Sequence, residues 1–288
     1  MASFVNPVIS GGVCYYSLAA RVEAVMVIDK LINYSFMDRD TIKIYPIGDV
    51  HLGAVQCNES AWRQFVSSLA NDPDAYIVLL GDLVDNATKN SVASPYDVVM
   101  SPMDQKKAMV KYLEPLRDKI LAITTGNHEA RSYKESGVDL TEDIAIKLDL
   151  ENRYRREICY VKVGVGKRSD GWPQQCYNMV ITHGAGSGSL TGAGINKTER
   201  FSSIIEGVDI FISGHSHKPA VTKPRRLVID TRTNSVVERD TVVLTASSWL
   251  SYGGYAAAKM LVPSSSCNPQ CLTLYGKTDK KRLMTVTW

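Results

Sequence analysis

Short apolar runs that end at a glycine and a polar residue constrain the fold of this chain more than any other feature. In the first half of the sequence, three such runs alternate with segments of helical periodicity. The runs cover residues 42–48, 75–80 and 120–124, and helices are expected over 59–71 and 105–119. Because the runs are continuously apolar, they predict strands covered on both faces, arranged in parallel βαβ units.

The second half is richer in β-type segments, and no internal repeat or linker separates it from the first. Strands are expected over 158–165, 176–184, 208–215, 225–231, 239–247 and 271–276, with a hairpin turn at Thr233-Asn234. We therefore predict one α/β domain, residues 41–288, with two packed mixed β-sheets flanked by helices. Residues 1–40 are expected to form an N-terminal extension with an amphipathic helix over about 17–33.

Composition excludes several other classes of protein. The 288 residues are 44% hydrophobic and 22% charged, which is typical of a globular chain rather than a disordered one. No run reaches the ~18 apolar residues of a membrane helix, and the N-terminus lacks the basic start of a signal peptide. The six cysteines lack zinc-site spacing, and the net charge is only +3. We expect a cytoplasmic protein (host cytoplasm if the gene is viral), with reduced thiols and no membrane partner.

All five histidines follow predicted strands, in segments rich in Gly, Asp and Asn. They are His51, His128, His183, His215 and His217. In an extended chain residues i and i+2 point to the same side, so Asp49 can face one pocket with His51, and His215 with His217. Ligands of open α/β sheets bind beyond the carboxyl ends of the strands, where about eight nitrogen and oxygen donors would converge. Such a donor set without thiolates predicts two divalent transition-metal ions, manganese first and iron, zinc, nickel or cobalt as alternatives.

The ordered motifs D-x-H, G-D-x-x-D, G-N-H-E, H and G-H-x-H resemble those of the calcineurin-like metallophosphoesterase superfamily. All five occur in order between residues 49 and 217, and the resemblance extends over about residues 41–276. Several intervening stretches are similar to compact phage and bacterial members. The resemblance implies a four-layer α/β/β/α sandwich and hydrolysis of phosphoric esters. In that chemistry a hydroxide that bridges two metals attacks the phosphoester in line.

The resemblance also implies a role for each motif residue. The first metal would be bound by Asp49, His51 and His217, the second by Asn127, His183 and His215, with Asp82 bridging the two. His128 would be catalytic beside the scissile phosphate, and Asp85 would fix its tautomer. The substrate would be contacted by Asn127 and His128. Outside the motifs, Arg131 follows Glu129 closely and could either contact the phosphate or form a surface ion pair.

Two departures from the protein phosphatases of this superfamily bear on the substrate. Their two arginines, which hold a phosphomonoester dianion, are replaced here by Asn86 and Thr125. This favours a phosphodiester substrate, such as a nucleotide or a nucleic acid. Basic residues that could flank a nucleic-acid cleft, or equally form a solvated surface, are Lys197, Arg200, Lys218, Lys223, Arg225 and Arg226.

Two other functions remain as alternatives. One is a phosphomonoesterase that acts on nucleotides or small phosphorylated metabolites, and the other is a catalytically silent scaffold subunit. The Gly-rich segment 184–194 lacks the residues of a nucleotide-binding loop and is expected to border His183. The sequence leaves the oligomeric state open.

Overall fold

The computed structural model describes residues 8–10, 13–15, 29–89, 91, 98–167, 174–186, 188, 190–276 and 283–288. The chain divides into two units, Met1–Lys30 and Leu31–Trp288. In the first unit, β1 (Val8–Ser10) pairs antiparallel with β2 (Val13–Tyr15). The second unit contains the remaining helices and strands.

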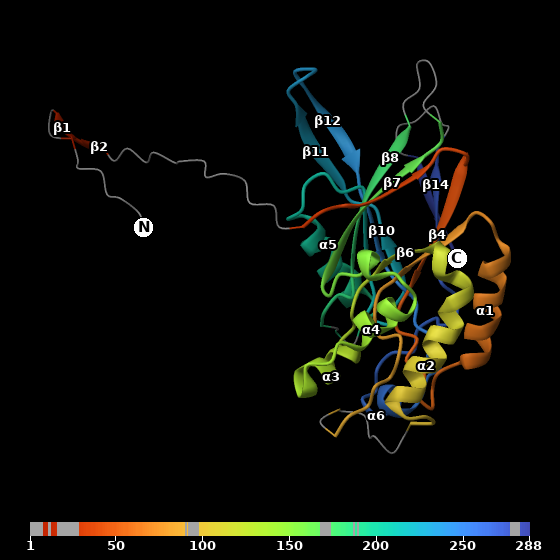
Figure 1. Cartoon of the computed structure of the whole chain (residues 1–288). Coiled ribbons are helices and arrows are strands. Elements are labelled where there is room, and N and C mark those ends of the chain that lie inside the picture. The colour runs from red at the N-terminus through yellow and green to blue at the C-terminus, as the bar shows by residue number, and fades with distance from the viewer. Residues whose placement is uncertain are drawn as a thin grey trace. The chain divides into compact units, whose positions relative to one another are not determined.

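Two mixed sheets form the centre of the second unit (Figure 1). The five-stranded sheet has the order β15-β14-β4-β5-β6, and the six-stranded sheet has the order β10-β13-β9-β8-β7-β3. The strands of the first are β4 (Thr41–Ile47), β5 (Ala75–Leu79), β6 (Ile120–Ile123), β14 (Cys271–Tyr275) and β15 (Met284–Thr287). Those of the second are β3 (Ile32–Phe36), β7 (Ile158–Val165), β8 (Gln175–Thr182), β9 (Ile210–Ser213), β10 (Ala220–Thr222) and β13 (Val242–Thr245).

Parallel pairing predominates where the sequence predicted βαβ units. Strands β4, β5 and β6 are parallel to one another, as are β8, β9 and β13. On its other edge β4 pairs antiparallel with β14, in a register that places Leu272 opposite Ile44. The C-terminal part of the chain therefore lies beside the first strand of this sheet.

Three hydrophobic clusters define four layers. Side chains of both sheets, such as Ile44, Val78 and Ile181, pack together in the buried cluster between the sheets. The other face of the five-stranded sheet packs against helices that contribute Trp62 and Met109, and Ile195 packs on the outer face of the six-stranded sheet. The predicted α/β/β/α sandwich is confirmed.

The helices of the second unit lie outside the two sheets, and the helices that contribute Trp62, Met109, Ile144 and Ile195 pack on the outer sheet faces. They are α1 (Glu59–Asn71), α2 (Pro102–Leu113), α3 (Glu129–Ser136), α4 (Leu140–Lys147), α5 (Gly192–Ser202) and α6 (Gly254–Ala258), with 3₁₀ turns η1 (Glu114–Lys119) and η2 (Glu151–Arg153). The predicted helix 59–71 is confirmed, and it begins where the Asn58 side chain accepts the Ala61 N–H. The predicted helix 105–119 is α-helical only to Leu113 and continues as η1, which contains Pro115.

The predicted N-terminal helix is wrong in the part that the structure describes. Residues 17–28 lie outside the described residues, but Ile32–Phe36 form strand β3 rather than the end of a helix. Its apolar residues alternate with exposed polar ones, and it pairs in parallel with β7. The compact unit that contains β3 extends over Leu31–Trp288.

The β-rich half contains a separate hairpin of β11 (Arg225–Asp230) and β12 (Ser235–Asp240), which confirms the turn predicted at Thr233-Asn234. The strand predicted over 239–247 is divided, because its first two residues belong to β12 and β13 begins at Val242. Among the described residues no helix combines the length and apolar character that crossing a membrane requires.

Candidate metal centre

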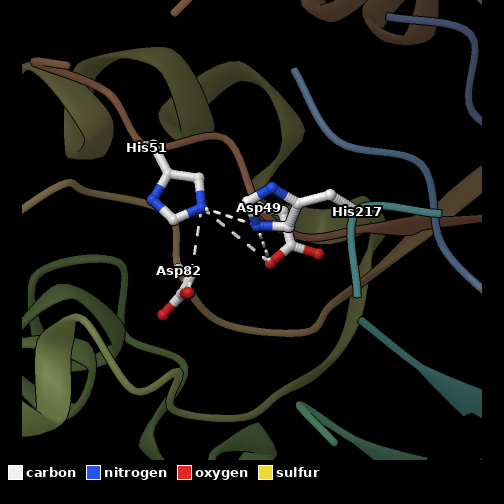
Figure 2. Close-up of side chains that lie close together, drawn as sticks. All are labelled: Asp49, His51, Asp82 and His217. Carbon is white, nitrogen blue, oxygen red and sulfur yellow. Dashed lines mark hydrogen bonds and ion pairs between the residues drawn. The ribbon is translucent and has the colours of Figure 1, made fainter. Parts of the chain in front are cut away.

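Side chains that follow the carboxyl ends of five strands, from both sheets, converge at one place. Asp49 and His51 follow β4, Asp82 follows β5, Asn127 and His128 follow β6, His183 follows β8, and His215 and His217 follow β9. Figure 2 shows Asp49, His51, Asp82 and His217 gathered from separate segments of the chain. The convergence predicted from the strand–histidine pattern is therefore present.

The backbone that produces this convergence is not extended. Asp49, His51, Asp82, His215 and His217 all have left-handed conformations, with φ between 49° and 67°. The sequence predicts that Asp49 with His51, and His215 with His217, face one pocket because the chain is extended. The side chains do lie close together, but the extended backbone that was given as the reason is wrong. Non-glycine residues in this region cost about 1–3 kcal/mol each and persist only where the surrounding structure enforces them.

One group of donors consists of Asp49, His51, Asp82 and His217. Nε2 of His51 lies 3.1 Å from Nε2 of His217 and 3.8 Å from Oδ2 of Asp82. Nε2 of His217 lies 3.3 Å from Oδ1 of Asp49. Adjacent ligands at right angles around an ion with bonds of about 2.1 Å are roughly 3.0 Å apart, so these spacings suit one shared cation.

A second group consists of Asp82, His183 and His215. Nε2 of His183 lies 3.4 Å from Oδ2 of Asp82 and 3.1 Å from Nδ1 of His215. The amide oxygen of Asn127 completes the group, at 2.9 Å from Nε2 of His183 and 2.7 Å from Nδ1 of His215. Asp82 belongs to both groups.

Each carboxylate presents one oxygen to its imidazoles because a backbone N–H holds the other. The N–H of His215 donates to Oδ2 of Asp49, and the N–H of His128 donates to Oδ1 of Asp82 (both 2.8 Å). Oδ1 of Asp49 is buried and, within the described part of the chain, has no hydrogen-bond donor. A buried carboxylate oxygen is expensive to leave unsatisfied, and a bound cation would satisfy it.

The histidine tautomers also suit metal binding. Nδ1 of His183 donates to the carbonyl oxygen of Leu80 at 2.7 Å, so in the neutral imidazole Nε2 carries the lone pair that faces Asp82 and Asn127. A hydrogen bond of this kind fixes the ring of a metal-binding histidine. The residues present therefore fit two divalent cations.

Burial and neighbouring charges oppose each other among these histidines. Burial, and then neighbouring His128, lowers the pKa of His51, and burial followed by His183 lowers that of His215. Burial acts to lower the pKa of His183 as well, but Asp82 outweighs it and raises the pKa to about 10. A positive charge is thus favoured beside Asp82, and a divalent cation is one way to supply it.

His128 lies at the edge of this centre. Its Nε2 is 3.9 Å from Oδ2 of Asp82, and its Nδ1 donates to the backbone carbonyl of Asp85 at 2.7 Å. The Asp85 carboxylate is 3.4 Å from the same Nδ1. Burial acts to lower the pKa of His128, but Asp85 and then Asp82 outweigh it and raise the pKa. The predicted proximity of His128 and Asp85 is present, with the backbone carbonyl making the shorter contact.

Glu129 is a component that sequence reasoning did not assign, although it closes the G-N-H-E motif. Its carboxylate is fully buried and accepts four backbone N–H groups. They belong to Asp82 (2.9 Å), Leu83 (2.6 Å), Val84 (3.1 Å) and Gly126 (3.2 Å). Glu129 therefore joins the segment after β5 to the segment after β6, and so fixes Asp82 relative to Asn127.

The two segments touch because both contain glycine at the crossing point. A Cβ atom on Gly126 would lie 2.1 Å from the backbone nitrogen of Asp82, and one on Gly81 would lie 2.1 Å from that of Gly126. Gly81 also has a φ of +84°. The close approach of the two backbone segments therefore requires glycine in the Gly81-Asp82 and Gly126-Asn127 pairs of the sequence.

Asn86 and Thr125 occupy buried positions and are hydrogen-bonded within the protein. The Asn86 amide donates to the His128 carbonyl (2.8 Å) and to the Ser132 hydroxyl (2.9 Å). The Thr125 hydroxyl shares a hydrogen bond of 2.8 Å with the Tyr154 hydroxyl. Arg131 is tied by one guanidinium N–H to the Asp85 carbonyl at 3.0 Å, beside His128.

Most of the basic residues considered for a nucleic-acid cleft are engaged within the chain. Lys218 is buried and donates to the carbonyls of Gly188 and Leu190 in the Gly-rich segment. Ion pairs or hydrogen bonds also hold Lys223, Arg225 and Arg226. Of the six basic residues considered for the cleft, this leaves Lys197 and Arg200, which are exposed on α5.

A four-layer α/β sandwich with two donor groups that share a carboxylate defines the class of metal-dependent phosphoesterases. The sequence profile of the calcineurin-like phosphoesterases matches residues 42–219. The chain belongs to this family, whose members are hydrolases of phosphoric esters.

Two solved structures are similar over most of this chain. The calcineurin-like phosphoesterase YfkN from Bacillus subtilis is 14% identical with a TM-score of 0.38, covering 86% of this chain and 90% of that one. GAP50, the anchor in the inner membrane complex of Plasmodium, is 11% identical with a TM-score of 0.39, covering 86% and 84%. No curated protein matches the chain.

Proposed function

We propose that the chain is a dinuclear-metal phosphodiesterase and that its substrate is a nucleotide or a nucleic acid. In this proposal Asp49, His51 and His217 hold one ion, and Asn127, His183 and His215 hold the other. The observation that supports two ions is the position of Asp82 Oδ2, 3.8 Å from Nε2 of His51 and 3.4 Å from Nε2 of His183. Oδ2 of Asp82 thus lies close to histidines of both proposed ligand sets.

The net charge of the centre suits an anionic substrate. Two divalent ions bring +4 and the Asp49 and Asp82 carboxylates bring −2, which leaves +2. Bound ions of this kind supply a nucleophile at neutral pH and neutralise phosphate charge. The donor set is oxygen and nitrogen without thiolate, and manganese is our first choice of metal.

His128 is proposed as the general acid for the leaving oxygen. Because Nδ1–H is held by the Asp85 carbonyl, Nε2 is the nitrogen that faces the centre. The side chain of His128 is 16% exposed, whereas that of Asp82 is 2% exposed, so a substrate can reach the His128 side chain more readily. Asp85 is proposed to orient His128, and Arg131 and Asn127 to contact the phosphate.

The preference for a diester is carried by Asn86 and Thr125. A monoester dianion needs more compensating charge than a diester monoanion, and the protein phosphatases supply it with arginines at these positions. Here both side chains are neutral, buried and hydrogen-bonded inside the protein. Arg131 is then the nearby cation that the proposal assigns to the substrate.

Parallel assays with bis-p-nitrophenyl phosphate and p-nitrophenyl phosphate test this proposal, with each metal at matched pH. We expect kcat/KM for the diester to exceed that for the monoester at least several-fold, because one charge-assisted hydrogen bond contributes about 1.5–3 kcal/mol. Asp82→Asn, prepared in the same way, controls for a contaminating phosphatase. A monoester preference that disappears in Asp82→Asn would overturn the diester assignment and favour the phosphomonoesterase alternative.

A further inference from the structure

The β11–β12 hairpin is a two-stranded sheet that pairs with neither of the two large sheets. In Figure 1 the hairpin lies at the opposite end of this unit from α3 and α6. Its base is fixed to the body by two arginines. Arg226 donates to the carbonyl of Ser202, and Arg239 pairs with Asp209 at 2.8 Å.

The outer half of the hairpin is apolar and exposed. Leu227, Ile229 and Val236 are 74%, 77% and 63% exposed, and they share one face because Ile229 lies opposite Val236 and Leu227 is two residues away. A lone two-stranded hairpin is marginally stable in water, and three or more strands are usually needed. Exposed apolar patches of this kind mark protein interfaces.

We propose that β11 pairs antiparallel with β11 of a second copy of this chain, across a two-fold axis at Val228. The result is a four-stranded sheet in the order β12-β11-β11-β12. Among the described residues β11 pairs with β12 alone, so its other edge has its backbone groups available. Addition of a strand to such an edge is a common mode of recognition.

The sequence of β11 is self-complementary in this register. A two-fold axis perpendicular to the sheet leaves each side chain on the same face of the sheet in both copies. Because side chains alternate between the faces, the residue at the axis must lie opposite the same residue of the second copy. With the axis at Val228, that residue lies opposite the partner's Val228, and Leu227 lies opposite the partner's Ile229. Arg226 then lies opposite the partner's Asp230. Its contacts in the portion of the chain that the structure describes are to the neutral oxygens of Ser202 and Ile205, which leave its charge uncompensated, so the register gives two pairs of opposite charge at the ends of an aliphatic centre.

Other registers lack this complementarity. With the axis at Leu227, Arg226 would lie opposite the partner's Val228 and form no charge pair. Pairing of β12 with itself at Glu238 would place two carboxylates opposite each other, which is unfavourable. Oδ1 of Asp230 accepts the N–H groups of Arg232 and Thr233, which leaves Oδ2 on the exposed strand to accept from an arginine of the partner.

A second copy also fits the charges better than a nucleic acid does. On the apolar face Arg225 is already neutralised, by Glu238 at 2.6 Å and Asp240 at 2.7 Å. The face therefore presents aliphatic side chains without surplus positive charge, whereas nucleic-acid surfaces depend on unpaired Lys and Arg.

Light scattering of the full chain over a range of concentrations tests the dimer directly. We expect a mass of two chains for the wild type and of one chain for Asp230→Arg, because that change places an arginine opposite the partner's Arg226. Asp118→Arg makes the same change in charge on an exposed residue of η1 and should remain dimeric. Hydrolysis of a small phosphoester should be unchanged in both variants. A single-chain mass for the wild type at every concentration, or a dimeric Asp230→Arg, overturns the proposal.

Disulfide trapping tests the register. Val228→Cys should form an intermolecular disulfide under mild oxidation, because the two cysteines would face each other with Cα atoms about 4.5–5.5 Å apart. Leu227→Cys and Ile229→Cys are matched controls, since each would be offset from its own copy by two residues along the strand and beyond the ~7 Å limit. We expect at least about 10-fold slower crosslinking in the controls. Equal rates for all three variants overturn the register at Val228.

Discussion

Replacing Glu129 by glutamine should destabilise the protein far more than a loss of one surface charge. The carboxylate is fully buried and accepts four N–H groups, two on each oxygen. A glutamine can keep two of these donors on its amide oxygen, but its NH₂ group must then face the other two. Each buried donor left unsatisfied costs about 1–3 kcal/mol, so the expected loss is about 2–6 kcal/mol in the free energy of unfolding. That is a large part of the roughly 5–15 kcal/mol that is typical of a folded domain.

Urea denaturation of the metal-loaded protein is the assay, and the midpoint should fall with the slope unchanged. Glu206→Gln is the matched control, because Glu206 is exposed. Metal content measured at limiting free metal should also fall, since Glu129 fixes Asp82 relative to Asn127. A Glu129→Gln midpoint within error of that of Glu206→Gln would refute the argument that these four N–H groups depend on the carboxylate.

Two further predictions concern the metal centre. The metal-loaded wild type should contain two ions per chain, and Asp82→Asn should lose at least one of them together with activity, as elemental analysis would show; one ion or fewer in active wild type contradicts this. His128→Ala should keep both ions but turn over at least about 100-fold more slowly, whereas His183→Ala should weaken metal binding. If His128→Ala empties the centre instead, His128 is a ligand rather than the proposed acid.

The sequence predicted best those elements that are set by continuous hydrophobic patterns. Strand β7 and helix α1 have the predicted bounds, because an apolar run or an amphipathic stripe with a capping residue specifies them locally. The apolar residues of strand β3 alternate with Asn33 and Ser35, but the strand was not predicted because it directly follows a segment of helical periodicity that is predicted to continue to residue 33. Its pairing partner, β7, lies more than a hundred residues away in the sequence, and no local signal reports such a pairing.

The residue types of the centre were predictable, but their geometry was not. Strand ends rich in His, Asp and Asn indicated where donors would gather, and the structure brings their side chains into groups. The left-handed backbone at Asp49 and His215 could not be predicted, because tertiary contacts impose it against the local preference of these residues. The internal hydrogen bonds of Asn86 were likewise invisible, since they depend on α3 approaching the segment after β5.

The position of β14 has a consequence for synthesis of the chain and for expression of fragments. A polypeptide that ended at residue 219 would contain all the proposed metal-binding residues. It would nevertheless lack β14, which covers one edge of β4, and β13, which covers one edge of β9. During synthesis, β4 and β9 can therefore pair with β14 and β13 only after the ribosome has released most of the C-terminal segment. A fragment of residues 42–219 would also lack β3, which pairs with β7, and would expose edges of β4, β7 and β9 from which aggregation could start.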